Sequence, residues 1–255
     1  MQTWLESQFS LAGKKALVTG ASKGIGAAIA EAFAHAGADL VLVGRSPNSL
    51  DQTRTSIEKI GRKVELLICD LSSSDQIVKA FADVQALHVD IVVNNAGTIS
   101  RAPAAQTTLH DWNRIIETNL NSVFLISQAC GRAMLERKSG AIINIASLLS
   151  FQGGINVPAY TASKHAVAGV TKALANEWAS QGVTVNAIAP GYIETDNTEA
   201  LRNDPDRNAS ILARIPTGRW GSTDDIASVA VFLASPAARY INGEVLTVDG
   251  GWMGR

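Results

Sequence analysis

The sequence predicts a single α/β domain over residues 1–255, in which a doubly wound parallel sheet carries helices on both faces. Two observations lead to this prediction. Short apolar runs of strand character alternate with longer helical segments along the whole chain, which is the pattern of consecutive βαβ units. No repeat, low-complexity tract or linker divides the 255 residues, a length that one large domain can accommodate.

The overall composition argues against several classes of partner. A net charge of −1 and a pI near 6.4 give no electrostatic basis for binding nucleic acid or an anionic membrane. No apolar run is long enough to span a membrane, and the first residues lack the pattern of a secretory signal. Cys69 and Cys130 lie far apart in apolar surroundings, which suggests a reducing compartment, so we expect a cytoplasmic protein. The four histidines are scattered without ligand spacing, so no metal site is expected.

The first predicted strand, residues 16–18, runs directly into a glycine-rich turn, and a helix of small residues then extends to Gly37. Glycines between a strand and a helix permit a tight turn and let the backbone approach a pyrophosphate, for which the helix N-terminus supplies N–H donors. This context predicts a Rossmann-type fold with a dinucleotide site, although the spacing G-x-x-x-G-x-G would also suit a mere tight connection. The predicted cofactor-binding residues of this turn are Gly20, Ser22, Lys23, Gly24, Ile25 and Gly26.

The end of the second strand, residues 40–43, bears on the choice of cofactor. Proteins that bind NAD commonly place an acidic side chain there, where it bonds the ribose hydroxyls. This chain has Gly44, Arg45 and Ser46 instead, so the 2′-phosphate of NADP can lie against Arg45 with help from Lys23. We therefore favour NADP(H), with NAD(H) as the alternative if Arg45 is an exposed arginine that stacks on adenine.

The turns after the third and fourth strands supply further candidates. Residues 64–69 form the third strand, and Asp70 at its end can bond the adenine amino group or, alternatively, cap a helix that begins near Ser74. Residues 90–93 form the fourth strand and end in Asn94-Asn95-Ala96-Gly97, where the asparagines can tie neighbouring strands together; a plain turn is the alternative. The end of the second strand adds Arg45 and Ser46 to the predicted cofactor-binding residues, and these two turns add Asp70, Leu71, Asn95, Ala96 and Gly97.

Capping signals delimit several helices. Ser46-Pro47 begins one that ends before Gly61, and Ser222 caps a last helix that runs to Ala234. Residues 108–136 carry an unusually long helical pattern, whose apolar face Asn119 interrupts. An inward amide needs partners, so Asn119 is either a satisfied structural group or part of a site.

A tyrosine and a lysine four residues apart point to acid–base chemistry. After a strand at residues 141–145, Ser147 precedes a helix that carries Tyr160 and Lys164 on one face and extends to Trp178. A neighbouring ammonium favours the phenolate, so we expect Lys164 to lower the pKa of Tyr160 toward neutrality, with Ser147 holding a substrate oxygen. The alternative is an exposed helical pair without function.

The sixth strand, residues 183–189, ends in Pro190-Gly191-Tyr192-Ile193-Glu194-Thr195, and a last strand covers residues 244–248. The polar stretch at residues 196–208 is expected to be mobile and to belong to a lid over the pocket, at about residues 193–215. Ligands of such sheets bind at the carboxyl ends of the strands, which is where the candidate residues gather.

Together these features resemble the short-chain dehydrogenase/reductase family over essentially the full length of the chain. The matching residues are Thr19-Gly20-x-x-x-Gly24-Ile25-Gly26, Asn94-Asn95-Ala96-Gly97, Asn119, Ser147, Tyr160-x-x-x-Lys164 and Pro190-Gly191. The resemblance implies that Tyr160 is the proton donor or acceptor, that Ser147 holds the carbonyl or alcohol oxygen, and that Lys164 binds the nicotinamide ribose. It also implies that Asn119 anchors a water in a proton relay and that the chain forms a homotetramer. Further implied cofactor contacts are Tyr160, Lys164, Pro190, Gly191, Ile193 and Thr195.

A closer resemblance is to the branch of 2-dehydro-3-deoxy-D-gluconate 5-dehydrogenases, also called 2-deoxy-D-gluconate 3-dehydrogenases. It rests on residues 147–154, 186–192, 214–221 and 248–252. Enzymes of that branch interconvert an alcohol and a ketone on sugar acids. They are often described as using NAD, an expectation from which Lys23 and Arg45 depart.

An anionic substrate would need a cation over the pocket. The candidates are Arg101 and Arg219, which are otherwise surface or subunit-contact groups. Gln152 and Tyr192 can bind hydroxyls, and Trp220 lies beside Arg219 in the sequence. The alternative functions are reduction of another carbonyl, such as a 3-oxoacyl thioester, a keto-sugar or a steroid, and a catalytically silent dinucleotide sensor.

Overall fold

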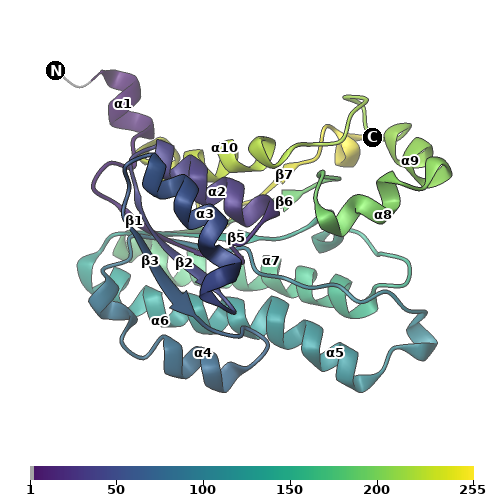
Figure 1. The fold of residues 1–255 in the computed structure, drawn as a ribbon, viewed down its shortest axis with the longest axis horizontal. Helices are drawn as coiled ribbons and strands as arrows, with labels where there is room; N and C mark the ends of the chain where they lie inside the picture. The colour runs from purple at the N-terminus through teal and green to yellow at the C-terminus, as the bar shows by residue number, and fades with distance from the viewer. Residues whose placement is uncertain (1–2) are drawn as a thin grey trace.

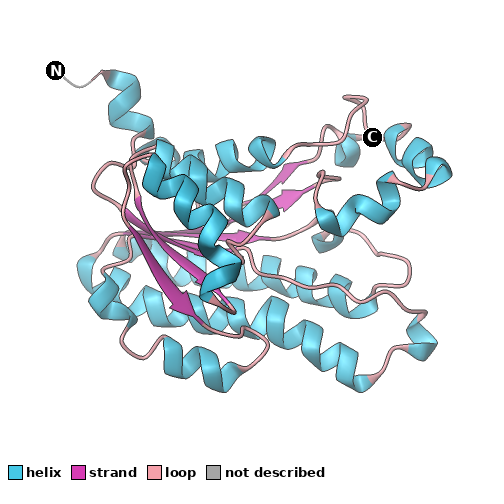
Figure 2. Ribbon diagram, viewed as in Figure 1, coloured by secondary structure: helices cyan, strands magenta, loops and turns pink. Residues whose placement is uncertain are grey.

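The computed structural model describes residues 3–255 and confirms the predicted sheet. Across that range seven strands form one parallel sheet in the order β3-β2-β1-β4-β5-β6-β7, drawn in magenta in Figure 2. The strand order reverses between β1 and β4, so a crevice is expected at the carboxyl ends of these two strands. The strands are β1 (Lys15–Thr19), β2 (Asp39–Gly44), β3 (Val64–Ile68), β4 (Ile91–Asn94), β5 (Gly140–Ile145), β6 (Val183–Pro190) and β7 (Val245–Val248).

Helices cover both faces of the sheet, as Figure 1 shows. One face carries α2 (Gly24–His35), α3 (Pro47–Lys59) and α10 (Thr223–Ala234), and the other carries α4 (Ser74–Ala80), α5 (Leu109–Ile116), α6 (Ser122–Arg137) and α7 (Pro158–Trp178). Phe33 belongs to the apolar core on the first face and Trp178 to the core on the second. Burial on both faces explains why the strands are continuous apolar runs in the sequence.

The predicted helix starts are confirmed by their caps. The Ser46 hydroxyl accepts a hydrogen bond from the N–H of Ser49 at 3.3 Å, and Pro47 is the first residue of α3. Ser222 forms a capping box with Asp225 at the start of α10, in which each residue's side chain bonds the other's N–H. These caps satisfy N–H groups that have no partner within the helix.

The long helical pattern at residues 108–136 forms one continuous helix that a π-helical turn interrupts. Thr108 caps α5, a π-helical turn follows at Glu117–Asn121, and α6 completes the helix. Asn119 lies in the π-helical turn and is fully buried. Such turns are frequent at functional sites, and this one places the Asn119 amide below the end of β4.

Some elements had no counterpart in the sequence prediction. The short helix α1 (Trp4–Phe9) buries none of its residues, and its six residues are too few for a helical pattern to stand out in the sequence. Two helices, α8 (Glu199–Arg202) and α9 (Pro205–Leu212), lie within the segment expected to form a lid, and Figure 1 shows them in green near the C-terminal end of the chain. Over residues 3–255, none of the helices is both long and apolar enough to cross a membrane.

Candidate active site

A cavity of about 1450 Å³ opens at the carboxyl ends of the strands. It is lined by the catalytic candidates Ser147, Tyr160 and Lys164, and by every predicted cofactor-binding residue except one. The exception is Gly26, which is buried behind the turn. The lining cofactor candidates are Gly20, Ser22, Lys23, Gly24, Ile25, Arg45, Ser46, Asp70, Leu71, Asn95, Ala96, Gly97, Tyr160, Lys164, Pro190, Gly191, Ile193 and Thr195.

The glycine-rich turn is built for close packing. Gly20 and Gly24 adopt the left-handed conformation that favours glycine, with φ of 63° and 58°. A Cβ atom on Gly26 would collide with the carbonyl oxygen of Gly20 and with the Asn95 side chain. No side chain longer than a hydrogen fits at Gly26, so α2 can begin directly against β1, as the glycine pattern predicts.

Asn95 joins the turn after β1 to the end of β4. Its Nδ2 donates to the carbonyl oxygens of Thr19 and Gly20 at 3.0 and 3.2 Å. In return the Thr19 hydroxyl accepts from the N–H groups of Asn95 and Ala96, both at 3.0 Å. The Asn94 side chain likewise donates to Asn144 on β5 at 2.9 Å, so the prediction that these asparagines tie strands together is confirmed.

The end of the cavity predicted to hold adenine has Arg45 and Asp70 on its wall. The Asp70 carboxylate accepts from the N–H and hydroxyl of Ser72, at 3.0 and 2.8 Å. The Ser72 backbone N–H is the main group that lowers the pKa of Asp70, and the nearby charge of Arg45 adds to the effect. The alternative role of Asp70 as a helix cap is wrong, because Ser73 caps α4.

Lys23 differs from the sequence expectation. Its ammonium lies 2.6 Å from the Asp196 carboxylate, on the expected lid, so it bridges the glycine-rich turn to that segment rather than lying free beside Arg45. Both side chains of this pair are about 70% exposed, at 71% and 68%. Exposed pairs of this kind contribute about 0–1 kcal/mol.

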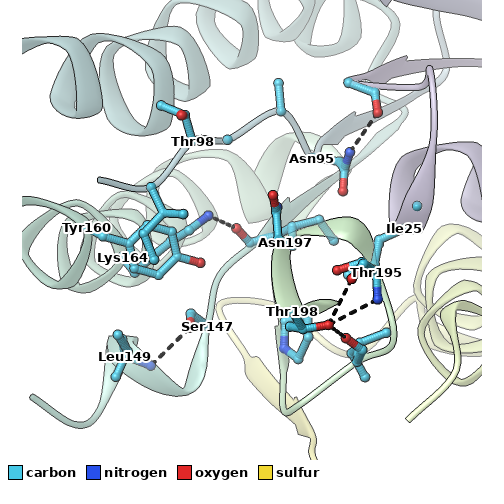
Figure 3. Close-up of a pocket in the computed structure, with 18 of the residues that line it drawn as sticks. Ile25, Asn95, Thr98, Ser147, Leu149, Tyr160, Lys164, Thr195, Asn197 and Thr198 are labelled. Atoms are coloured by element: carbon cyan, nitrogen blue, oxygen red, sulfur yellow. Dashed lines mark hydrogen bonds between the residues drawn. The ribbon is translucent and has the colours of Figure 1, made fainter. Parts of the chain in front are cut away.

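Tyr160 and Lys164 stand side by side on α7, with Ser147 on the adjacent segment, as Figure 3 shows. The Lys164 Nζ lies 5.6 Å from the centroid of the Tyr160 ring and donates to the carbonyl oxygen of Ile145 at 2.6 Å. The Ser147 hydroxyl accepts from the N–H of Leu149 at 3.1 Å. Three of the four predicted catalytic side chains, Ser147, Tyr160 and Lys164, therefore share one wall of the cavity.

The expected effect of Lys164 on Tyr160 is wrong in this structure. Burial raises the pKa of the Tyr160 phenol, while hydrogen bonding with Ser147 and the charge of Arg101 offset part of that rise. Burial also lowers the pKa of Lys164 to about 8. Desolvation disfavours the charged form of each group, and the ammonium bonds a backbone carbonyl rather than the phenol.

Asn119 is buried and does not line the cavity, although it bonds Thr98, which does. Its amide donates to the Thr98 carbonyl at 2.9 Å and to the Ser163 hydroxyl at 3.2 Å, and it accepts from the Thr98 N–H at 2.8 Å. Ser163 in turn donates to the carbonyl of Tyr160 at 2.7 Å. The side chain thus has the partners that a buried amide needs, and it fixes the loop after β4 to the first turn of α7.

Two of the residues expected to meet the substrate lie elsewhere. Arg101, Ser147, Gln152 and Tyr192 line the cavity, but Trp220 does not. Trp220 is buried behind Tyr192, with its Nε1 donating to Asn208 at 2.7 Å.

Arg219 is also removed from the pocket. Its guanidinium makes two bonds to the Asp225 carboxylate, at 2.7 and 3.0 Å, and these hold the pKa of Asp225 well below its usual range. Its expected role as the substrate-binding cation is therefore wrong.

The sequence prediction missed part of the cavity wall. Arg207, Arg214 and Trp252 line it, although they come from α9, the stretch after it and the end of the chain. The Arg255 guanidinium donates to the carbonyl of Ala213 at 2.9 Å, which joins the C-terminal end to this region. Arg214 and Trp252 stood in segments that carried the resemblance, but nothing in their spacing indicated that they fold back over the site.

Comparison with known proteins gives matches over nearly the whole chain. A family model described as "Enoyl-(Acyl carrier protein) reductase" matches residues 20–253. A 2-dehydro-3-deoxy-D-gluconate 5-dehydrogenase from Bacillus subtilis is 53% identical over 253 residues, covering 99% of each chain.

Solved structures give the same picture. One is a protein from Agrobacterium tumefaciens, provisionally named as a 2-deoxy-d-gluconate 3-dehydrogenase and solved with bound NADP. It is 52% identical to this chain, and the match has a TM-score of 0.92 and covers 97% of this chain and 99% of that one. A gluconate 5-dehydrogenase from Burkholderia cenocepacia, in complex with NADP and tartrate, is 36% identical; its TM-score is 0.94, with 98% and 99% of the two chains covered.

Proposed function

The chain belongs to the short-chain dehydrogenase/reductase family of NAD(P)-dependent oxidoreductases, and from this we propose that it interconverts a secondary alcohol and a ketone on a sugar acid. The substrate we favour is 2-dehydro-3-deoxy-D-gluconate, which the name of the Bacillus subtilis relative contains. The observation that carries the proposal is the meeting of Ser147, Tyr160 and Lys164 on one wall of a cavity that also has the glycine-rich turn.

The residues around the glycine-rich turn fit NADP(H). Gly20 and Gly24 line the cavity in the left-handed conformation and leave the backbone free to approach a pyrophosphate, and the end of β2 has Arg45 where an acidic residue would disfavour a 2′-phosphate. The bound NADP of the Agrobacterium tumefaciens protein also supports this preference over NAD(H). When bound, the cofactor supplies the hydride chemistry.

We assign the reaction's proton to Tyr160. In the direction of reduction its Oη donates a proton to the substrate oxygen, and in the direction of oxidation it accepts one. Ser147 holds that oxygen, and Lys164 binds the cofactor ribose. Asn119 positions the loop after β4; the relay water implied for it would bond elsewhere than the side-chain N–H groups, which Thr98 and Ser163 occupy. Further cofactor contacts are assigned to Pro190, Gly191, Ile193 and Thr195.

The charge on the cavity wall supports an anionic substrate. Arg101 is close enough to lower the pKa of Tyr160, so a cation lies near the proposed reacting group. Arg207 and Arg214 add positive charge from the lid side. Within residues 3–255, the acidic residues of the wall are Asp70 at the adenine end and Asp196, which is paired with Lys23.

We also propose three further properties of the chain. The first is a lid at about residues 193–215, the second is assembly as a homotetramer, and the third is a cytoplasmic location. The bonds from Lys23 to Asp196 and from Arg101 to the carbonyl of Asn197, at 2.6 and 3.5 Å, support a lid that closes against two other elements. Exposed apolar side chains along α5 and α6, such as Leu109, support association. Both cysteines are free, which supports a reducing compartment.

A substrate panel tests the proposed function. We would follow NADPH consumption with keto acids derived from sugars, neutral keto-sugars and 3-oxoacyl thioesters. Sugar acids should give the highest kcat/KM. A higher value for the thioester would favour acyl reduction, and tight cofactor binding without any turnover would indicate a sensor.

A further inference from the structure

Arg214 has its guanidinium fixed on the face of an aromatic ring. Its Cζ atom lies 3.9 Å from the centroid of the Trp252 ring, and both residues line the cavity. A guanidinium stacked on an indole is attracted by the ring, yet its N–H donors lie in its own plane and stay free. The face of the Arg214 guanidinium is therefore fixed against the ring, while the N–H donors along its edge stay available to a ligand.

The ring that carries Arg214 is itself immobilised. Trp252 is 6% exposed and packs on Tyr192, with the ring centroids 4.8 Å apart. Tyr192 meets Trp220 edge-on at 5.4 Å. The Trp252 Nε1 donates to Gln152 at 3.4 Å. Three aromatic rings and an amide thus form a rigid platform beneath the guanidinium.

Two other cations of the cavity wall are already engaged, and Arg207, which has no such bond among the described residues, is not stacked on a ring there. Lys23 is paired with Asp196, and Arg114 donates to Thr98 and Asp111 at 3.2 and 3.4 Å. Among the residues that the structure describes, no hydrogen bond or ion pair involves the side chain of Arg214.

We propose that Arg214 binds the carboxylate of the substrate and thereby selects sugar acids over neutral sugars. This inference rests on the proposed function. A guanidinium can donate two parallel N–H···O bonds to a carboxylate, and a stacked guanidinium loses little freedom when it does so. Arg219 stands five residues further along the chain and cannot take this role, because Asp225 occupies its donors.

The test compares Arg214→Gln with Arg219→Gln as a matched control, using 2-dehydro-3-deoxy-D-gluconate as the alcohol and NADP as the hydride acceptor. Loss of a bidentate charged contact should raise KM for the sugar acid roughly 10- to 100-fold. We expect kcat and the NADPH Kd of Arg214→Gln to stay within about twofold of wild type, and Arg219→Gln to keep the wild-type KM. Arg214→Lys retains the charge without the planar fork, so its KM should lie between those of wild type and Arg214→Gln.

Two results would overturn the inference alone. One is an unchanged KM in Arg214→Gln; the other is a parallel loss of kcat and NADPH affinity, which would indicate a structural role. A wild-type enzyme that turns over neutral ketones but no sugar acid would instead overturn the proposed function, and this inference with it.

Discussion

At the scale of single residues, Tyr160 and Lys164 lie on the cavity wall, and desolvation is the largest influence on the pKa of each. Burial raises the pKa of the phenol and lowers that of the ammonium to about 8, so it disfavours the charged form of both groups. A protonated phenol is the form required of a proton donor to a ketone oxygen. The oxidation direction needs the phenolate, which the charge of Arg101 favours.

Tyr160→Phe removes the proposed proton donor and leaves the ring in place. We expect kcat to fall by a factor on the order of 100 or more, because general acid–base catalysis contributes about that much. The NADPH Kd, measured by fluorescence titration, should be nearly unchanged. Near-wild-type turnover in this variant would show that another group handles the proton.

Lys164 makes stability depend on pH. Its pKa in the folded protein is about 8, below its ordinary value of 10.5, so the unfolded chain binds more protons between these values. The free energy of unfolding should therefore rise as pH increases from 8 toward 10, by at most roughly 3 kcal/mol.

The matched variant for this effect is Lys164→Met, whose urea unfolding curves should lack the rise. Measurements should stop at pH 10, because the raised pKa of Tyr160 gives a stabilising contribution that is lost as pH increases above its ordinary value of 10. A wild-type stability that is flat or falling between pH 8 and 10 would contradict the assigned direction of the Lys164 shift.

Arg45 should set the preference between cofactors. Replacing it in Arg45→Ala removes the cation proposed to bind the 2′-phosphate, so the NADPH Kd should rise roughly tenfold or more. NADH lacks that phosphate, and its Kd should change little. Isothermal titration with both cofactors tests the prediction, and an equal loss for both would place Arg45 against the adenine instead.

At the scale of elements, the turn between β1 and α2 tolerates no side chain at Gly26. In Gly26→Ala the new methyl group would meet the Gly20 carbonyl and the Asn95 side chain, so we expect a loss of about 1–3 kcal/mol in stability and weaker NADPH binding.

Gly169→Ala in α7 is the matched control, because nothing lies within 4 Å of its new methyl group. Alanine favours a helix interior by about 0.5–1 kcal/mol over glycine, so this variant should be as stable as wild type or more stable. Thermal unfolding of both variants checks the pair. Equal effects at the two glycines would mean that the close contact at Gly26 relaxes without cost.

The elements themselves were largely predictable, and the reasons are local. Apolar runs, serine caps and glycine stops gave the strands and helices their approximate bounds, because each signal acts within one turn of the chain. The π-helical turn at Asn119 was not predictable, since it depends on partners in Thr98 and Ser163 that lie far away in the sequence.

At the scale of the whole molecule, the sheet explains why so much of the site was predictable. Parallel strands all end at the same edge, so residues placed after different strands had to meet there. Segments that do not follow a strand lack that constraint, so their place in the site was harder to predict. Arg219 was expected over the pocket and pairs with Asp225, whereas Arg214 reaches the cavity because the end of the chain folds back beneath it.

The contact between Arg255 and Ala213 has a practical consequence for anyone who handles this protein. A substitution of Arg255 would remove its bond to the stretch that carries Arg214, and so would act on the wall that Arg214 and Trp252 line. Figure 1 shows α1 at the far side of the molecule from α8 and α9. A label on α1 would therefore lie away from the part of the cavity wall that α9 supplies.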